Sequence, residues 1–186
     1  MKKIIPVIFC ALFCLSGYGQ KSAKYYNKGV RQAKNGNYET AIRSFTKAIT
    51  VSPDFPDALY NRGLAKSKIK DYPGAIIDYT KAIAIRPHFP MAYLNRGADR
   101  NELKQFSEAI SDYTKAIDME PSYAVAFFNR GVVWYKLKEW AKALTDFSKA
   151  VELKPDYQEA LYNQDLALGR LIYEMGVLLL YASPNR

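Results

Sequence analysis

A repeat of 34 residues is the feature of this sequence that most constrains its fold. Four copies align at that interval without an insertion, at residues 22–55, 56–89, 90–123 and 124–157. A period of this size is typical of stacked arrays, in which each copy of one small unit buries its apolar face against the next copy. We number the positions within each copy as places 1 to 34.

The residue types that recur in all four copies predict a pair of helices. Small and apolar residues return at three- and four-residue steps, which indicates helices, and small side chains allow two helices to approach closely. Proline at place 32 cannot continue a helix interior, so it ends the second helix. A lysine-containing turn separates the two helices. The recurring residues are glycine at place 8 (Gly29, Gly63, Gly97, Gly131), alanine at places 20 and 27 (Ala41, Ala75, Ala109, Ala143; Ala48, Ala82, Ala116, Ala150), and Pro53, Pro87, Pro121 and Pro155.

Aromatic residues at places 17 and 24 are predicted to fill the space between the helices. A regular aromatic stripe at helical spacing is most often part of a core. The residues are Tyr38, Tyr72, Phe106 and Trp140 at place 17, and Phe45, Tyr79, Tyr113 and Phe147 at place 24.

These places resemble the tetratricopeptide repeat family over residues 22–157. The resemblance implies an all-α fold, a right-handed α-solenoid of four tetratricopeptide helix pairs, with a concave groove formed by the first helices. It also implies a non-catalytic interaction module that holds a peptide or protein segment in that groove. The family's tryptophan at place 4 is here Tyr25, Leu59, Tyr93 and Phe127, which leaves the packing argument intact.

Residues 158–183 begin a fifth copy and then depart from the pattern, because Asp165 stands where glycine is expected. A helix without a partner of its own normally covers the last face of an array, so we expect a C-terminal capping helix. Residues 171–181 are apolar on more sides than one covered face requires. Either Gly169 or Gly176 breaks the helix so that it folds back, or the surplus contacts another protein. The second alternative includes a self-assembling scaffold of the cell envelope, a homo-oligomer joined through residues 171–181.

The first nineteen residues have the layout of a secretory signal peptide. Lys2 and Lys3 precede an apolar run from Ile4 to Leu15, and small residues follow it at Gly17 and Gly19. The run is shorter than the roughly 20 residues that a membrane-spanning helix needs. We therefore expect cleavage before Gln20, no stable transmembrane span, and export to the periplasm or the extracellular space. An uncleaved anchor is the alternative. Because both cysteines lie in this segment, the mature chain would contain none.

Asparagine occupies place 6 of every copy and of the capping helix, and by the resemblance this place faces the groove. A carboxamide offers a donor and an acceptor, so it can pair with the backbone of a bound peptide whatever its side chains. The alternative is that each asparagine forms a hydrogen bond from one helix to the next. The residues are Asn27, Asn61, Asn95, Asn129 and Asn163.

By the same resemblance, places 5 and 13 are among the other places that face the groove. Place 5 provides an apolar and aromatic strip, and place 13 provides a basic margin interrupted by Glu102. Such a surface suits an extended peptide with apolar anchors and acidic side chains, and the formal charge of +9 also favours anionic partners. The residues are Tyr26, Tyr60, Leu94, Phe128 and Tyr162 at place 5, and Lys34, Lys68, Lys136 and Arg170 at place 13.

Arginine at place 7 occurs where aspartate stands at place 23, in the second, third and fourth copies. We interpret each pair as an ion pair between the two helices of a copy, for which bidentate geometry would be suitable. The alternative is a row of arginines that binds an acidic ligand. The pairs are Arg62 with Asp78, Arg96 with Asp112, and Arg130 with Asp146.

The sequence offers little for catalysis or for nucleic-acid binding. The single histidine, His88, follows Pro87 in an expected loop, and no glycine-rich phosphate loop, nucleophile elbow or metal-ligand spacing occurs. The lysines are spread around turns, and the aromatic residues follow packing periods instead of forming a stacking platform. We therefore predict no enzyme activity, no cofactor, no metal site and no nucleic-acid partner.

Overall fold

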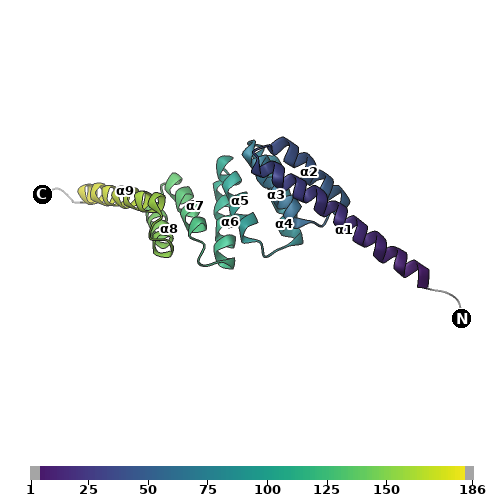
Figure 1. Cartoon of the computed structure of the whole chain (residues 1–186). Helices are drawn as coiled ribbons and strands as arrows, with labels where there is room; N and C mark the ends of the chain where they lie inside the picture. The colour runs from purple at the N-terminus through teal and green to yellow at the C-terminus, as the bar shows by residue number, and fades with distance from the viewer. Residues whose placement is uncertain (1–4, 183–186) are drawn as a thin grey trace. The chain divides into compact units, whose positions relative to one another are not determined.

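The computed structural model describes the backbone of residues 5–182 and the side chains of residues 19–176. Every regular element in this range is an α-helix, so the predicted all-α class is confirmed (Figure 1). The helices are α1 (Ile5–Lys34), α2 (Tyr38–Val51), α3 (Pro56–Lys68), α4 (Tyr72–Ile85), α5 (Pro90–Glu102), α6 (Phe106–Met119), α7 (Ala124–Lys136), α8 (Trp140–Leu153) and α9 (Gln158–Ala182).

The chain divides into two compact parts, residues 1–99 and residues 100–186, and the boundary falls within α5. In the N-terminal part, α2 packs against α1 and α3, and α3 packs against α4. In the C-terminal part, α7 packs against α6 and α8, and α9 packs against α8. Consecutive helices thus pack against each other, which is the arrangement expected of stacked helix pairs.

The glycine at place 8 allows the two helices of a repeat to approach closely. A methyl group placed on Gly63 would lie 2.6 Å from the ring of Tyr79, and one on Gly29 would lie 2.6 Å from the ring of Phe45. The same contact recurs in the C-terminal part, where Gly131 faces Phe147 at 2.8 Å. All four rings at place 24 are at most 1% exposed, so their predicted place in the core is confirmed.

The turn within each repeat has a left-handed residue at place 15. The φ angle is 77° at Gly36, 64° at Lys70, 59° at Lys104 and 62° at Lys138. At each turn the next backbone N–H donates to the carbonyl five residues earlier at 2.9 Å, which closes the end of the first helix. Left-handed backbone favours glycine, so three repeats accept a strained lysine in order to keep this closure.

The capping helix α9 runs from Gln158 to Ala182 without a break. The alternative that Gly169 or Gly176 interrupts it is therefore wrong. A methyl group at either glycine would meet nothing within 4 Å, so both face open space, and a helical glycine costs only about 1 kcal/mol relative to alanine. The buried side chains of the helix are Ala160 and Ala167.

The N-terminal helix α1 continues from the predicted signal segment into the first repeat without a break, from Ile5 to Lys34. Cleavage before Gln20 stays a prediction. Among the helices of the described residues, none has the length and apolar character needed to cross a membrane.

Replacement of Gly63 by alanine should lower the free energy of unfolding by about 2 kcal/mol, because the new methyl group would overlap the Tyr79 ring. Gly169→Ala is the matched control, and it should raise the free energy of unfolding by up to about 1 kcal/mol, since its methyl group meets open space. Urea denaturation followed by circular dichroism measures both changes. Equal effects of the two substitutions would show that the helix spacing does not depend on place 8.

Candidate functional site

Asparagines at place 6 in the N-terminal part join consecutive repeats. The Nδ2 atom of Asn61 donates to the Tyr26 hydroxyl at 3.2 Å and to the backbone carbonyl four residues earlier at 2.8 Å. Asn95 repeats this arrangement with the Tyr60 hydroxyl at 2.9 Å and its own helix carbonyl at 2.8 Å. The hydrogen bond from one helix to the next, which was the alternative to peptide binding, is therefore present at both asparagines.

These hydrogen bonds also fix which way each carboxamide points. A backbone carbonyl can only accept, so the atom that faces it must be the amide nitrogen. Both N–H groups of Asn61 and of Asn95 are then engaged, and their Oδ1 atoms accept no hydrogen bond from any described residue. Each asparagine is half-buried, so an oriented carbonyl oxygen remains at the surface of α3 and of α5.

The other three asparagines lack this tyrosine partner. Place 5 holds Leu94 and Phe128 in the third and fourth repeats, and neither side chain has a hydroxyl group. The Nδ2 atom of Asn163 donates only within its own helix, to the carbonyl of Glu159 at 2.7 Å, as far as the described residues show. Asn129 is half-buried on α7, and Asn27 is exposed on α1.

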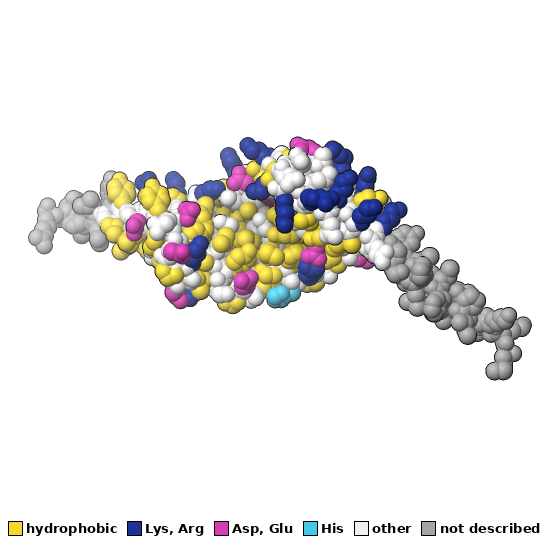
Figure 2. Space-filling view, viewed as in Figure 1, with side chains coloured by type: hydrophobic (Ala, Val, Ile, Leu, Met, Phe, Trp, Pro, Cys, Tyr) yellow, Lys and Arg dark blue, Asp and Glu magenta, His cyan; other side chains and the backbone are white. Residues whose placement is uncertain are grey.

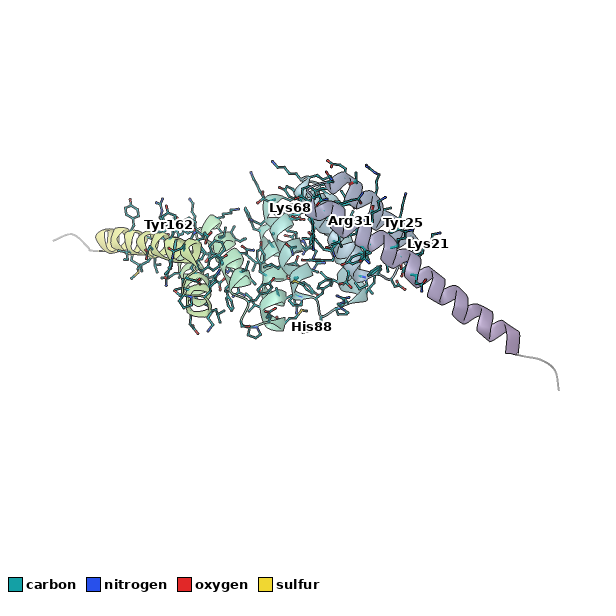
Figure 3. All side chains as sticks on the ribbon, viewed as in Figure 1. Lys21, Tyr25, Arg31, Lys68, His88 and Tyr162 are labelled. Atoms are coloured by element: carbon teal, nitrogen blue, oxygen red, sulfur yellow. The ribbon has the colours of Figure 1, made fainter. Side chains whose placement is uncertain are left out.

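The rings at place 5 help to pack each repeat as well as forming part of its surface. The Tyr60 ring centroid lies 5.8 Å from that of Tyr79 and 4.9 Å from that of Phe89. Tyr26 and Phe128 make the equivalent pairs of contacts in the first and fourth repeats. Leu94 is buried at 9% exposure, whereas Tyr162 is 65% exposed on α9 (Figure 3).

Partial burial raises the pKa of the Tyr26 hydroxyl. The negative charge of Asp57 raises it further, while the hydrogen bond from Asn61 acts in the opposite direction. The hydroxyl therefore stays protonated at neutral pH and can accept the Asn61 hydrogen bond.

The four basic residues predicted at place 13 are all exposed, and Figure 3 labels one of them, Lys68. The Nζ atom of Lys136 donates to Asn101 Oδ1 at 2.9 Å and lies 6.0 Å from the ring centroid of Phe106. Lys34 extends from the last turn of α1, and Arg170 lies on α9.

Arg170 also borders a surface hollow of about 450 Å³ in the C-terminal part. Aromatic rings form much of its lining, and the centroids of Tyr135 and Trp140 lie 4.9 Å apart. Trp140 was predicted to pack in the core, and Tyr173 lies in the apolar stretch 171–181 that was predicted to fold back or to contact another protein, whereas no role was predicted for Tyr135. The described residues that line it are Tyr135, Lys138, Trp140, Arg170, Tyr173 and Glu174.

The predicted ion pairs between places 7 and 23 are confirmed in two repeats. Arg62 donates to both carboxylate oxygens of Asp78 at 2.8 and 2.6 Å, and Arg130 donates to both oxygens of Asp146 at 2.8 Å. The Asp78 side chain is completely buried and also contacts the Nζ atom of Lys66 at 2.8 Å. These two arginines are therefore engaged within the fold, and the alternative of a free arginine row is wrong for them.

The side chain at place 7 also forms a hydrogen bond to the preceding repeat. The Nη1 atom of Arg62 donates to Thr46 at 3.1 Å, and that of Arg96 donates to Thr80 at 3.0 Å. In the C-terminal part, Arg130 donates to Thr114 at 2.9 Å, and Gln164 donates to Ser148 at 2.8 Å. One side chain thus joins three helices, which fixes the register between repeats.

Apolar side chains of α9 are exposed to solvent in the part of the helix whose side chains the structure describes. Ile172 is 60% exposed, Tyr173 is 70% exposed and Met175 is 56% exposed. Self-association through residues 171–181 stays a prediction, because the side chains of residues 177–181 lie outside the described residues.

The side chains that the structure describes include no group of three or more His, Cys, Asp or Glu residues arranged to hold a metal ion. His88 is exposed in the loop between α4 and α5 (Figure 3).

The hydroxyl group of Tyr79 is buried and has no hydrogen-bond partner among the described residues. Burial raises the pKa of this hydroxyl far above its ordinary value, and the negative charge of Asp99 raises it further. The folded chain therefore keeps the proton at a pH where the unfolded chain releases it. The resulting stability is fully present below about pH 10, the pKa of an unfolded tyrosine, and is lost progressively as the pH rises above it.

Tyr79→Phe should raise the free energy of unfolding at neutral pH by about 1 kcal/mol, because it removes a buried hydroxyl without a partner. Above about pH 10 the variant should also lose stability less steeply, by up to about 1.4 kcal/mol per pH unit. Urea denaturation at several pH values measures both effects, and Tyr162→Phe, at an exposed side chain, is the control. A destabilised Tyr79→Phe variant would contradict this account of the hydroxyl.

Models of one repeat family match most of the chain. Models described as tetratricopeptide repeat match residues 56–89, 124–157 and 92–123, and a model described as TPR repeat matches residues 29–70. Together these matches cover residues 29–89 and 92–157. A search of curated proteins found no match.

Several solved structures have a similar fold. A crystal structure of MamA protein is 22% identical with a TM-score of 0.79, and the match covers 88% of this chain and 89% of that chain. The Pseudomonas aeruginosa pilF structure is 23% identical with a TM-score of 0.75, covering 84% of this chain and 72% of that one. The first TPR of Spaghetti (RPAP3), bound to HSP90 peptide SRMEEVD, is 29% identical with a TM-score of 0.62, covering 63% and 93%. The folding pattern is what these structures share with the chain.

Proposed function

The chain belongs to the tetratricopeptide repeat family, and we propose that it is an exported, non-catalytic module that binds a segment of another protein along its first helices. The observation that carries this proposal is the fixed orientation of two carboxamides, on Asn61 and Asn95. The Spaghetti (RPAP3) repeat, which is solved with a bound peptide, supports the use of this fold for such a purpose.

The two asparagines contact the backbone of the bound segment. Their Oδ1 atoms are acceptors already held in place, so a peptide N–H can donate to them with little loss of side-chain entropy. Backbone recognition of this kind is independent of the peptide's side chains. The asparagines thus have two roles, since their nitrogens join neighbouring repeats and their oxygens accept from the ligand.

Exposed basic and aromatic side chains in each of the two parts favour an acidic segment with apolar residues. In the N-terminal part, Lys34 and Lys68 are exposed on α1 and at the end of α3. In the C-terminal part, the hollow beside Arg170 offers aromatic rings to an apolar side chain and a guanidinium group to a carboxylate. Exposed lysines contribute mainly to the rate of association and to the choice of partner.

Asn95→Ala should weaken peptide binding much more than Tyr60→Phe, because Tyr60→Phe keeps the acceptor oxygen and the hydrogen bond from Asn95 to the Met91 carbonyl. Both substitutions remove the hydrogen bond between Asn95 and Tyr60, so both should lower the melting temperature by a similar amount. Only Asn95→Ala removes the acceptor oxygen, which should raise the Kd about fivefold to tenfold. The probe is a peptide selected from a random library on the unmodified protein, with its Kd measured by fluorescence anisotropy. Equal loss of affinity in both variants would leave Asn95 with a structural role only.

Export is supported by the first nineteen residues, whose basic, apolar and small-residue sections follow the order of a secretory signal. Protein recovered from the periplasm or the medium of expressing cells should have Gln20 as its first residue. N-terminal sequencing and intact mass measure this directly. Recovery of the intact chain in the membrane fraction would instead support an uncleaved anchor.

A further inference from the structure

The outer face of α1 carries a row of cations. Lys21, Lys24, Lys28 and Arg31 are separated by three, four and three residues, so they lie on one side of the helix, and all four are exposed. Figure 3 labels Lys21 and Arg31 along this helix, and Figure 2 shows basic side chains gathered over the same region. No acidic residue precedes Glu39 in the sequence. We call these four residues the α1 cation row.

Two members of the α1 cation row, Lys24 and Arg31, occupy places that are buried in every later repeat. Lys24 is at place 3, where the later first helices have Ala58, Ala92, Ala126 and Ala160, each 0% exposed. Arg31 is at place 10, where the later residues are Ala65, Asp99, Val133 and Ala167, each at most 3% exposed. The later repeats use this face to pack against the second helix before them, as Ala65 does against Ala41 and Phe45. In α1 the residues at these two places, Lys24 and Arg31, are exposed instead.

The end of an array needs a polar outer face, but solubility alone does not require one sign of charge. The opposite end of the chain shows this, because α9 carries both signs on its exposed surface, including Asp165, Arg170 and Glu174. Charge is also divided unevenly along the chain. Residues 20–99 contain 14 Lys and Arg against six Asp and Glu, a formal charge of +8, whereas residues 100–186 contain 11 against 12, a formal charge of −1.

We propose that the α1 cation row docks the N-terminal part on an anionic membrane surface, with phospholipid headgroups as its ligands. A row on the surface of a single helix encloses no site for a small anion. Three of its four members are lysines, whose flexible point charges suit a field of mobile headgroups, whereas fixed bidentate recognition of a protein carboxylate favours arginine. Charge complementarity therefore indicates an extended anionic surface.

Two features close to the α1 cation row also support binding to a membrane surface. The Tyr25 side chain lies on α1 beside the row, with the Nζ atom of Lys47 at 6.0 Å from its ring centroid, and tyrosine is enriched where proteins meet lipid headgroups (Figure 3). The row also begins a few residues after the apolar sequence that ends at Leu15, on the same unbroken helix. The row itself remains whether or not residues 1–19 are removed. None of its residues belongs to places 5, 6 or 13, so the proposal does not rest on the peptide site.

Each basic residue close to an anionic leaflet strengthens partitioning about fivefold at physiological ionic strength. Loss of three members of the row should therefore weaken partitioning about 100-fold. The effect should fall steeply with added salt, because exposed charges are screened within about 8 Å at physiological ionic strength.

The test uses co-sedimentation of the full chain with two kinds of vesicle, phosphatidylcholine alone and phosphatidylcholine mixed with phosphatidylglycerol. The ratio of the two partition coefficients isolates the charge effect, because the apolar sequence near the N-terminus contributes to both. The variant Lys24→Gln/Lys28→Gln/Arg31→Gln removes three charges from the row. The matched control Lys104→Gln/Lys115→Gln/Lys154→Gln removes three charges from exposed positions of the C-terminal part. Circular dichroism confirms that each variant is folded.

The unmodified chain and the control should prefer the anionic vesicles strongly. The row variant should lose about 100-fold of that preference. Equal losses in the row variant and the control would show diffuse attraction by net charge and would overturn the proposal. Equal binding of the unmodified chain to both vesicles would also overturn it. A third arm measures binding to poly-glutamate, and tighter row-dependent binding there than to anionic vesicles would assign the row to an acidic protein instead.

Discussion

The contact between the glycine at place 8 and the aromatic ring at place 24 sets the distance between the two helices of a repeat. Gly63 and Tyr79 show how little room there is, since a single methyl group would overlap the ring. Because the helices are this close, the arginine at place 7 can reach the aspartate at place 23 with both of its donor atoms. The tyrosine at place 5 likewise packs on the ring at place 24. The surface carboxamides are thus positioned by a steric limit inside the repeat.

Arginines that pair with buried aspartates also fix the register between repeats. Asp78 and Asp146 are almost completely buried, so their carboxylates would be unfavourable without the bidentate arginines that face them. Each of these arginines also donates to a threonine of the preceding repeat. A shift of one repeat relative to the next would break these arginine–threonine hydrogen bonds, whereas each ion pair lies within one repeat and would remain.

Much of the fold could be predicted from the sequence because the packing residues repeat. The recurrence of glycine at place 8 and of an aromatic ring at place 24 predicted that both residues pack between the helices, and the structure shows them in contact. Recurrence did not decide the role of the asparagines at place 6, because an asparagine that joins two helices and one that binds a peptide would both recur in every copy. The signal that distinguishes them is the tyrosine 35 residues before Asn61 and before Asn95, which is absent before Asn129 and Asn163. The continuity of α9 was also undetermined, because two glycines weaken a helix without deciding whether it ends.

The buried face at places 3 and 10 would let the array accept additional repeats. Since every internal first helix presents the same face to the helix before it, a further 34-residue copy inserted after Phe55 or after Tyr123 would find a matching neighbour on each side. Gene duplication could therefore lengthen the array without redesigning any internal contact. The residues that depart from the repeat pattern lie at the two ends of the array, namely Lys24 and Arg31 in the first repeat and Asp165 in α9. A longer array would keep these residues at its ends.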